Sequence, residues 1–478
     1  MQDAAYSTLL RSRRQQLHAL ITRTLEKDFP EIVVVEPQLL AHHCTEAGFT
    51  EKAIGYRLLA GQQLMARSAM MEAEAQILRG VDLLSLLPEN SERDNHELDL
   101  QMALGPILAT TAGYAAPNVG KALARARQLC KELDRPLELA FLLTGQCTYH
   151  MLAGDLILAN REVQEIKDLG EATNNNDIKF VAQGHSALVQ FHFGDFTRTK
   201  THAELALGIY RRENPLFSWG PSDEKASLLQ FLSRSLVYLG HLDQARLYQQ
   251  KALAYAPERM HPLTLAEALQ LSIQVDQALK TDSTVRLKRA EELIEYCAEH
   301  GFPYWAAGAL WVRGESLLDL GRMDEALVVL LDALIKFQAT GAVTVVPSFR
   351  TAVARALGGS GQPEDGLKQL VEAERQIEET QERWYEAEMH RVFGEVLIAA
   401  DDPASAEDRF VKSIDVARRQ NAKLWEVRAA TSLARLWQDQ GKRVAARDLL
   451  APVYGSFTEG FDTPVLSEAK SLLEQLQA

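Results

Sequence analysis

Side chains of metal-binding types occur together at His42, His43 and Cys44. Consecutive residues on a helix point about 100° apart, so three in a row cannot converge on one metal ion. Cys147 and His150 are three residues apart and would share a helix face, but two ligands alone do not make a zinc site. We therefore expect Cys147 to be a packed thiol, and we predict no metal site and no cofactor.

Glu386 and His390 are four residues apart and could form an acid–base couple, although an exposed pair is the ordinary interpretation of this spacing. The sequence contains no GxxxxGK[ST] phosphate loop and no HExxH zinc motif. The string GHSAL at 184–188 is nearest to a GxSxG elbow, but it falls within a predicted helix and not at a strand-to-helix turn. We therefore predict no catalytic residues and expect that the chain is not an enzyme.

The composition indicates a helical protein without an affinity for nucleic acid. A chain of 478 residues is longer than the chains that fold around a single hydrophobic core, so it must form several domains or one repeat array. Strong helix formers predominate in most windows. A net charge of −14 disfavours nucleic acid as a partner, because phosphate-binding surfaces carry a clustered basic excess. With no signal-peptide or membrane-spanning stretch and four dispersed cysteines, we predict a location in a bacterial-type reducing cytoplasm.

The C-terminal half contains a repeat with a period of about 40. A turn position holds Gly321, Gly361, Asp401 and Gly441; a small residue follows at Ala326, Gly366, Ala406 and Ala446, and a large apolar one at Leu330, Leu370, Phe410 and Leu450. Glycine or aspartate at the turn allows the left-handed conformation that ends a helix. The small residue allows the second helix of a pair to approach the first, and the large residue is expected to fill the space between neighbouring pairs.

The same turn recurs upstream at Gly154, Gly194 and Gly240, whereas the pair near TDSTVRLKRAEELIEYCAEHG lacks its turn glycine. The sequence predicts an all-α fold, an α-solenoid of tetratricopeptide-like helix-turn-helix repeats in a right-handed superhelix, with about ten or eleven helix pairs. The standard tetratricopeptide period is about 34, and HEAT-type repeats are the alternative at this length. The glycine-then-alanine register favours the tetratricopeptide interpretation.

In tetratricopeptide arrays the first helix of each pair lines the concave face. This geometry predicts a partner-binding groove that contains Arg234, Trp311, Glu315, Arg355, Arg391, Glu395 and Arg435. Guanidinium groups pair with carboxylates and stack on aromatic rings, so the groove would suit an acidic or carboxylate-bearing segment. The alternative is that these are solvated surface residues beside neighbouring glutamates.

Several strings resemble one family of large bacterial signalling proteins. They include QDAAYSTLLRSRRQQLHALITRTLE and PQLLAHHCTEAGFTEKAIGYRLLAGQQ near the N-terminus, and RAATSLARLWQDQGKRVAARDLLAPVYGSFTEGFDTPVLSEAKSLLEQL near the C-terminus. In that family a class III adenylate/guanylate cyclase domain precedes an AAA-type signal-transduction ATPase and a tetratricopeptide array. The resemblance implies that residues 1–30 are the terminal helix of an ATPase module and that 31–478 are the repeat array. The chain would then be a fragment, a split gene product or a truncated form of such a protein.

The resemblance implies a regulatory, protein-interaction scaffold, the sensor or partner-binding region of a cyclase–ATPase protein. Its expected partner is a protein or peptide, with the ATPase or cyclase module as a candidate, and no membrane. A second hypothesis is a small-molecule receptor that holds its ligand inside the superhelix, where the aromatic residues of 302–305 and Trp311 gather. A third is a cyclase or ATPase, although no position in the chain matches the catalytic residues of either.

Overall fold

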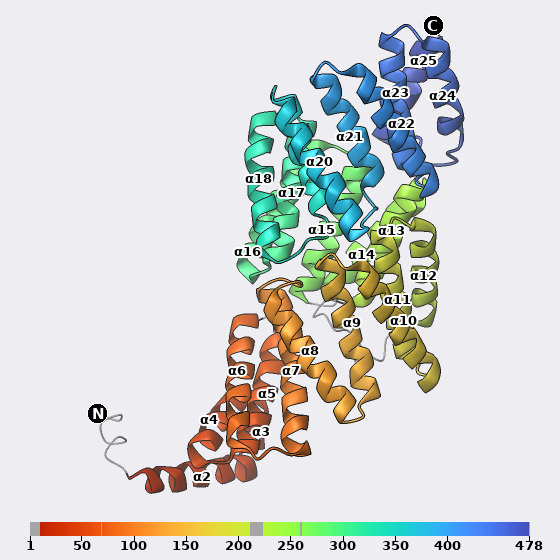
Figure 1. Ribbon diagram of the computed structural model, residues 1–478. Coiled ribbons are helices and arrows are strands. Elements are labelled where there is room, and N and C mark those ends of the chain that lie inside the picture. Colours follow the sequence, from red (N-terminus) through yellow and green to blue (C-terminus); the bar gives the residue numbers. More distant parts are fainter. Residues whose placement is uncertain (1–9, 68, 211–222, 259–260, 478) are drawn as a thin grey trace. The chain divides into compact units, whose positions relative to one another are not determined.

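The computed structural model describes residues 10–67, 69–210, 223–258 and 261–477, and these residues form helices and no strands (Figure 1). The helices pack as adjacent antiparallel pairs, which confirms the predicted α-solenoid of tetratricopeptide-like repeats. Among the described residues, each helix is too short or too polar to pass through a lipid bilayer. Of the predicted terminal helix over 1–30, the segment 1–9 lies outside the described residues, and the boundary at residue 30 stays a prediction.

The chain divides into two compact units, which we treat separately. The N-terminal unit comprises residues 1–111 and 117–145, and the C-terminal unit comprises 112–116 and 146–478. The N-terminal unit contains α2 (Arg11–Asp28), α3 (Pro30–Val35), α4 (Pro37–Ala47), α5 (Thr50–Ala66), α6 (Met70–Leu83), the 3-10 helix η1 (Leu84–Leu86), α7 (Ser91–Thr111), α8 (Pro117–Glu132) and the first part of α9 (Pro136–Leu152).

The C-terminal unit contains the rest of α9 and the remaining helices of the array. These are α10 (Leu156–Thr173), α11 (Asn176–His192), α12 (Phe196–Ile209), α13 (Glu224–Leu239), α14 (Leu242–Glu258), α15 (Pro262–Ala278), α16 (Ser283–His300), α17 (Pro303–Asp319), α18 (Met323–Ala339), α19 (Val346–Gly359), α20 (Pro363–Thr380), α21 (Glu386–Ala399), α22 (Pro403–Arg419), α23 (Lys423–Asp439), α24 (Arg443–Gly455) and α25 (Pro464–Gln477).

The turn register is confirmed by the backbone. Gly321, Gly361 and Gly441 each have φ of 76°, and Asp401 has φ of 62°. In the pair that lacks a turn glycine, Lys280 takes the left-handed position with φ of 56°. A lysine there costs more than a glycine would, because its Cβ crowds the backbone in this conformation. The left-handed turn is therefore present in this pair although the glycine that marks it in most other repeats is missing.

The small and large positions of the repeat also have a structural role. A Cβ built on Gly366 would lie 2.9 Å from the carbonyl oxygen of Ala354, so only glycine allows the two helices of that pair to approach so closely. A Cβ on Gly314 would lie 2.5 Å from Leu330, and one on Gly394 would lie 2.5 Å from Phe410. Leu330 and Phe410 therefore pack against the first helix of their own pair. That the large residue fills the space between neighbouring pairs stays a prediction.

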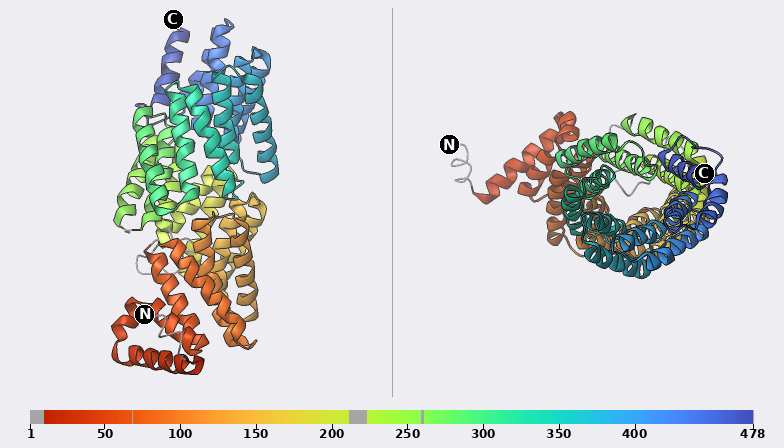
Figure 2. Two further views of the ribbon diagram at one scale, coloured as in Figure 1. Left: turned by 90° about the vertical axis from the view of Figure 1, so that its left-hand side faces the viewer. Right: turned by 90° about the horizontal axis from the view of Figure 1, so that it is seen from above.

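The helices of the C-terminal unit are arranged in a ring when viewed from above (Figure 2). Segments that are far apart in the sequence touch each other: the backbone N–H of Val343 donates to the Leu152 carbonyl at 2.8 Å, and that of Arg383 donates to the His192 carbonyl at 2.8 Å. Further along, Arg246 pairs with Asp462 at 2.9 Å. One superhelical turn of the array therefore packs against the next. The first helices of the pairs face the interior of the ring, which we call the lumen.

Candidate functional site

All seven residues of the predicted groove lie around the lumen, although whether they bind a partner stays a prediction. They come from α13, α17, α19, α21 and α23, each the first helix of its pair. The alternative of solvated surface residues is wrong for Arg234, Trp311, Glu315 and Arg391, because each is at most 6% exposed. Close packing of the first helices around the closed ring explains this burial.

One cavity of the lumen, the polar cavity, has a volume of about 390 Å³. Its walls contain Lys280, Ser283, Arg286, Asp319, Arg355, Arg391, Glu395, Arg428, Thr431, Ser432, Arg435, Val465 and Glu468. Six of these side chains are basic and three are acidic, so the cavity has a local positive excess in a chain whose net charge is −14. A carboxylate or phosphate is the kind of group that such a cavity would attract.

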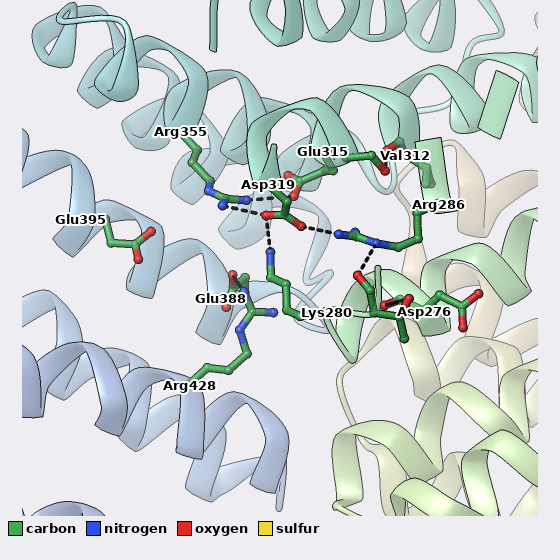
Figure 3. Close-up of polar contacts among 12 residues, drawn as sticks. Asp276, Lys280, Arg286, Val312, Glu315, Asp319, Arg355, Glu388, Glu395 and Arg428 are labelled. Atoms are coloured by element: carbon green, nitrogen blue, oxygen red, sulfur yellow. Dashed lines mark hydrogen bonds and ion pairs between the residues drawn. The ribbon is translucent and has the colours of Figure 1, made fainter. Parts of the chain in front are cut away.

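Asp319 organises one wall of the polar cavity (Figure 3). Its Oδ1 accepts from Lys280 Nζ at 2.7 Å and from Arg355 Nη2 at 2.8 Å, and its Oδ2 accepts from Arg286 Nη2 at 2.7 Å. Burial would raise the pKa of Asp319, but the charges of these three cations hold it well below its usual range. Burial and the neighbouring Arg355 lower the pKa of Lys280 to about 8. One carboxylate therefore balances three cations.

Arg286 has hydrogen-bonding capacity that the described residues do not use. Its side chain is 1% exposed, and its Nε donates to the Thr281 carbonyl at 3.2 Å. Its Nη1 is buried and has no hydrogen-bond partner among the described residues. A buried donor without an acceptor costs about 1–3 kcal/mol, so an anion that accepts from this group would be favoured.

A second buried ion cluster is formed by residues of α21 and α23, within electrostatic reach of Lys280. Glu388 Oε1 accepts from Arg391 Nη2 at 2.8 Å and from Arg428 Nη2 at 2.7 Å. Burial would raise the pKa of Glu388, but these two arginines lower it to about 2. Arg391 also pairs with Glu395, and Arg435 pairs with Glu468 at 2.6 Å on the exposed rim. The cations of the cavity are thus held in place by carboxylates behind them.

A second cavity of about 160 Å³, the apolar cavity, is lined mainly by aromatic and aliphatic side chains, which come chiefly from α9, α11, α13, α15, α17 and α19. Tyr304, Trp305 and Trp311 line it, as the sequence predicted for this aromatic group, whereas Phe302 packs elsewhere against His300. The guanidinium carbon of Arg234 lies 4.2 Å from the centre of the Phe191 ring. Burial lowers the pKa of this arginine and raises that of Glu224, at the cavity wall, to about 8.

A narrow space joins the two cavities along the lumen. It shares Gln274 and Trp311 with the apolar cavity, and it shares Lys280 and Arg428 with the polar cavity. Glu315 also borders it. The buried side-chain oxygens of Gln274 and Gln277 in this space have no hydrogen-bond partner among the described residues. The lumen therefore presents a cationic region next to an aromatic one, with polar groups between them.

Glu386 and His390 are not an exposed pair, so that interpretation is wrong. They are 5% and 1% exposed on α21, and each has its own partner. Glu386 pairs with Arg383 at 3.0 Å, and Arg409 Nη1 donates to His390 Nδ1 at 3.3 Å.

Two further predictions are confirmed. Cys147 is 1% exposed, as expected of a packed thiol. The string at 184–188 lies within α11.

We expect His390 to make the C-terminal unit sensitive to acid. Burial, and then the charge of Lys412, lower the pKa of His390 to about 3, whereas a histidine in the unfolded chain titrates near 6.5. Between these values the unfolded chain binds more protons, so the free energy of unfolding falls as pH falls. In His390→Gln this dependence is expected to be weaker, measured by urea unfolding at several pH values from 7 to 4. Equal slopes in both proteins would contradict the assignment.

The structure defines the chain as a tetratricopeptide-like helical repeat protein. No family model matches it. It is 23% identical, over 91% of its length, to the uncharacterized protein R02095 of Rhizobium meliloti, and it spans 43% of the length of that relative. A Rap protein complexed with Competence and Sporulation Factor has a similar fold, with a TM-score of 0.58 and 16% identity over 77% of this chain and 99% of that one. A STAND protein with a tetratricopeptide repeat sensor from Pyrococcus horikoshii has a TM-score of 0.39 and 16% identity over 79% of this chain and 55% of that one.

Proposed function

We propose that the chain is a non-catalytic regulatory scaffold that binds an acidic or carboxylate-bearing segment of a protein or peptide in its lumen. The observation that carries this proposal is the polar cavity, where six basic side chains face three acidic ones and the buried Nη1 of Arg286 has no partner among the described residues. Asp319 and Glu388 already order these cations, so the protein's own side chains would lose little entropy when a ligand binds.

The adjoining apolar cavity indicates what else the segment contains. A carboxylate in the polar cavity and an aromatic or aliphatic side chain in the apolar cavity would both find complementary surroundings, with the polar groups of the joining space available to a peptide backbone. An extended peptide of a few residues can carry both groups. The Rap protein of similar fold was solved in complex with Competence and Sporulation Factor, which supports the idea that such an array can hold a partner.

We further propose that the array is the sensor region of a longer cyclase–ATPase signalling protein. The resemblance of its sequence to that family supports this context, as does the greater length of the Rhizobium relative. In such a protein a segment bound across several helix pairs would change the strain in the array, since the described pairs pack against their neighbours and against the adjoining superhelical turn. The ATPase or cyclase module would receive that change.

A selection from a random library of short displayed peptides tests the binding proposal. We expect the enriched peptides to combine aspartate, glutamate or a free C-terminal carboxylate with an aromatic or aliphatic residue, and to lose binding when the carboxylates become amides. A selection that enriches no binders, or only peptides without acidic groups, would contradict the proposal. Unselected library peptides provide the baseline composition.

The second candidate function is a small-molecule receptor, and the apolar cavity with Tyr304, Trp305 and Trp311 in its wall favours it. A metabolite that binds only the folded chain must raise its melting temperature. A thermal-shift screen of wild type beside Leu188→Trp, which places a larger side chain at the cavity wall, distinguishes the two functions. A small ligand that stabilises wild type and not this variant would support the receptor.

A further inference from the structure

Three imidazoles from two helices of the N-terminal unit come together. His18 lies on α2, and His42 and His43 lie on α4. Each imidazole offers one ring nitrogen, and these three nitrogens lie within 4.8 Å of one another. The Nδ1 atoms of His18 and His43 are hydrogen-bonded at 2.8 Å. Neighbouring residues on one helix cannot by themselves surround an ion, but the third imidazole comes from a second helix. Sequence reasoning missed His18 because it belongs to a different helix and no short motif connects it to His42.

The packing of α2 on α4 creates this arrangement. His18 and Thr22 are the buried residues of α2, and the Thr22 hydroxyl lies 3.9 Å from the buried Cys44 sulfur of α4. His18 is 6% exposed, His43 is half-buried and His42 is exposed. The cluster therefore has a buried floor and an open side, through which an ion in water could enter.

The chemistry of the cluster suits a metal ion of the zinc type. Each of the three imidazoles offers a ring nitrogen, the commonest side-chain ligand for such ions. Zinc–nitrogen bonds of about 2.0–2.1 Å in a tetrahedral site place ligand nitrogens about 3.3 Å apart. The three ligand nitrogens lie within 4.8 Å of one another. Rotation of the rings, with loss of the hydrogen bond between the Nδ1 atoms of His18 and His43, would bring the nitrogens to that spacing.

We propose that His18, His42 and His43 form a binding site for one divalent transition-metal ion, with Zn²⁺ as its principal occupant and water at the fourth position. Three neutral imidazoles bind Zn²⁺, Co²⁺, Ni²⁺ and Cu²⁺ in preference to Mg²⁺ or Ca²⁺, which favour oxygen ligands. The bound ion joins α2 to α4 and holds these two helices together.

The test uses the full chain without any polyhistidine tag, freed of metal with a chelator. Titration with Co²⁺ is expected to give the visible bands of a four-coordinate site with one ion per chain, and Zn²⁺ is expected to remove them. Zn²⁺ should also raise the melting temperature, because it binds the folded site. Absence of the bands together with an unchanged melting temperature would overturn the proposal.

His42→Ala is the decisive variant, because His42 is exposed and its removal leaves the packing of α2 on α4 intact. We expect at least about a tenfold loss of Zn²⁺ affinity. His96→Ala, on α7 of the same unit, removes a histidine outside the cluster and is expected to bind as wild type does. Equal Zn²⁺ affinity in wild type and His42→Ala would show that the ion binds elsewhere and would overturn the proposal.

Discussion

Asp319→Asn is expected to destabilise the C-terminal unit by about 3–5 kcal/mol, because it leaves buried cations without their counter-charge. Asp319 is the shared partner of Lys280, Arg286 and Arg355, and the substitution keeps its size while it removes its charge. After the substitution, Arg355 keeps its ion pair with Glu315, at 3.3 Å. The loss is measured at pH 7 as the shift in the urea midpoint followed by helical circular dichroism.

Asp332→Asn is the matched control for Asp319. Asp332 lies on the outer face of α18, where it pairs with Lys336 at 2.7 Å in an exposed position. An exposed pair of this kind contributes about 0–1 kcal/mol. Phosphate in the buffer should stabilise Asp319→Asn more than it stabilises wild type, because an anion can replace the missing carboxylate. Similar stabilities for both variants would show that the cations of the polar cavity are not held by Asp319.

Glu382→Ala is expected to cost about 3 kcal/mol, since it removes a buried carboxylate that accepts three hydrogen bonds. Glu382 is 3% exposed and accepts from Trp384 Nε1 at 2.6 Å, from the backbone N–H of Val345 at 2.7 Å and from His192 Nδ1 at 3.4 Å. His192 belongs to α11 and Val345 precedes α19, so this carboxylate links one superhelical turn to the next.

Val345 adds to the effect of Glu382→Ala. It is a β-branched residue with φ of 77°, a strained conformation that the bond from its N–H to Glu382 helps to hold. Hydrogen exchange at the amides of Val343 and Arg383, which join the two turns, is expected to accelerate in this variant. Glu379→Ala, at an exposed pair with Arg375 on the same stretch of chain, is expected to leave the exchange unchanged. Unchanged exchange in Glu382→Ala would contradict this role.

The fold could be predicted from the sequence because its signal is local and repeated. The turn residues from Gly321 to Gly441 recur at one spacing, and each makes the same left-handed turn. The same register carries Glu315, Arg355, Glu395 and Arg435, each one repeat after the last, so the groove residues could be placed on one face. A periodic pattern fixes which side of each helix faces inward.

The enclosure of the lumen could not be predicted in the same way. It depends on contacts between segments far apart in the sequence, such as that between Val343 and Leu152, and no local pattern encodes the superhelical pitch that produces them. Consequently much of the predicted groove consists of buried ion clusters, and Glu395 and Arg435 lie at its more exposed rim. Lys280, Asp319 and Arg428 were missed, although Arg428 follows Glu388 by one period and could have been found from that register.

The buried clusters also decide which variants can test binding. Charge reversal of Arg355 or Arg391 would place a carboxylate beside Asp319 or Glu388 and unfold the array, so loss of binding would carry no information. Arg435 is on the exposed rim of the polar cavity, and Ser432 beside it is half-buried. Arg435→Glu faces Glu468, but both side chains are about half exposed, so water screens the repulsion. The double variant Arg435→Glu/Ser432→Asp therefore changes the charge of the cavity with little expected effect on folding.

The most direct test of the claim that the lumen binds the partner is a fluorescence anisotropy measurement. It compares the affinity of wild type and of this double variant for one selected acidic peptide that carries a fluorescent label. Arg447→Glu, an exposed charge reversal on α24 away from the cavity, is the control. If the lumen is the binding site, the double variant binds at least about tenfold more weakly, a difference of about 1.4 kcal/mol, while Arg447→Glu binds as wild type does. Equal affinity for all three proteins would contradict the claim that the lumen binds the partner.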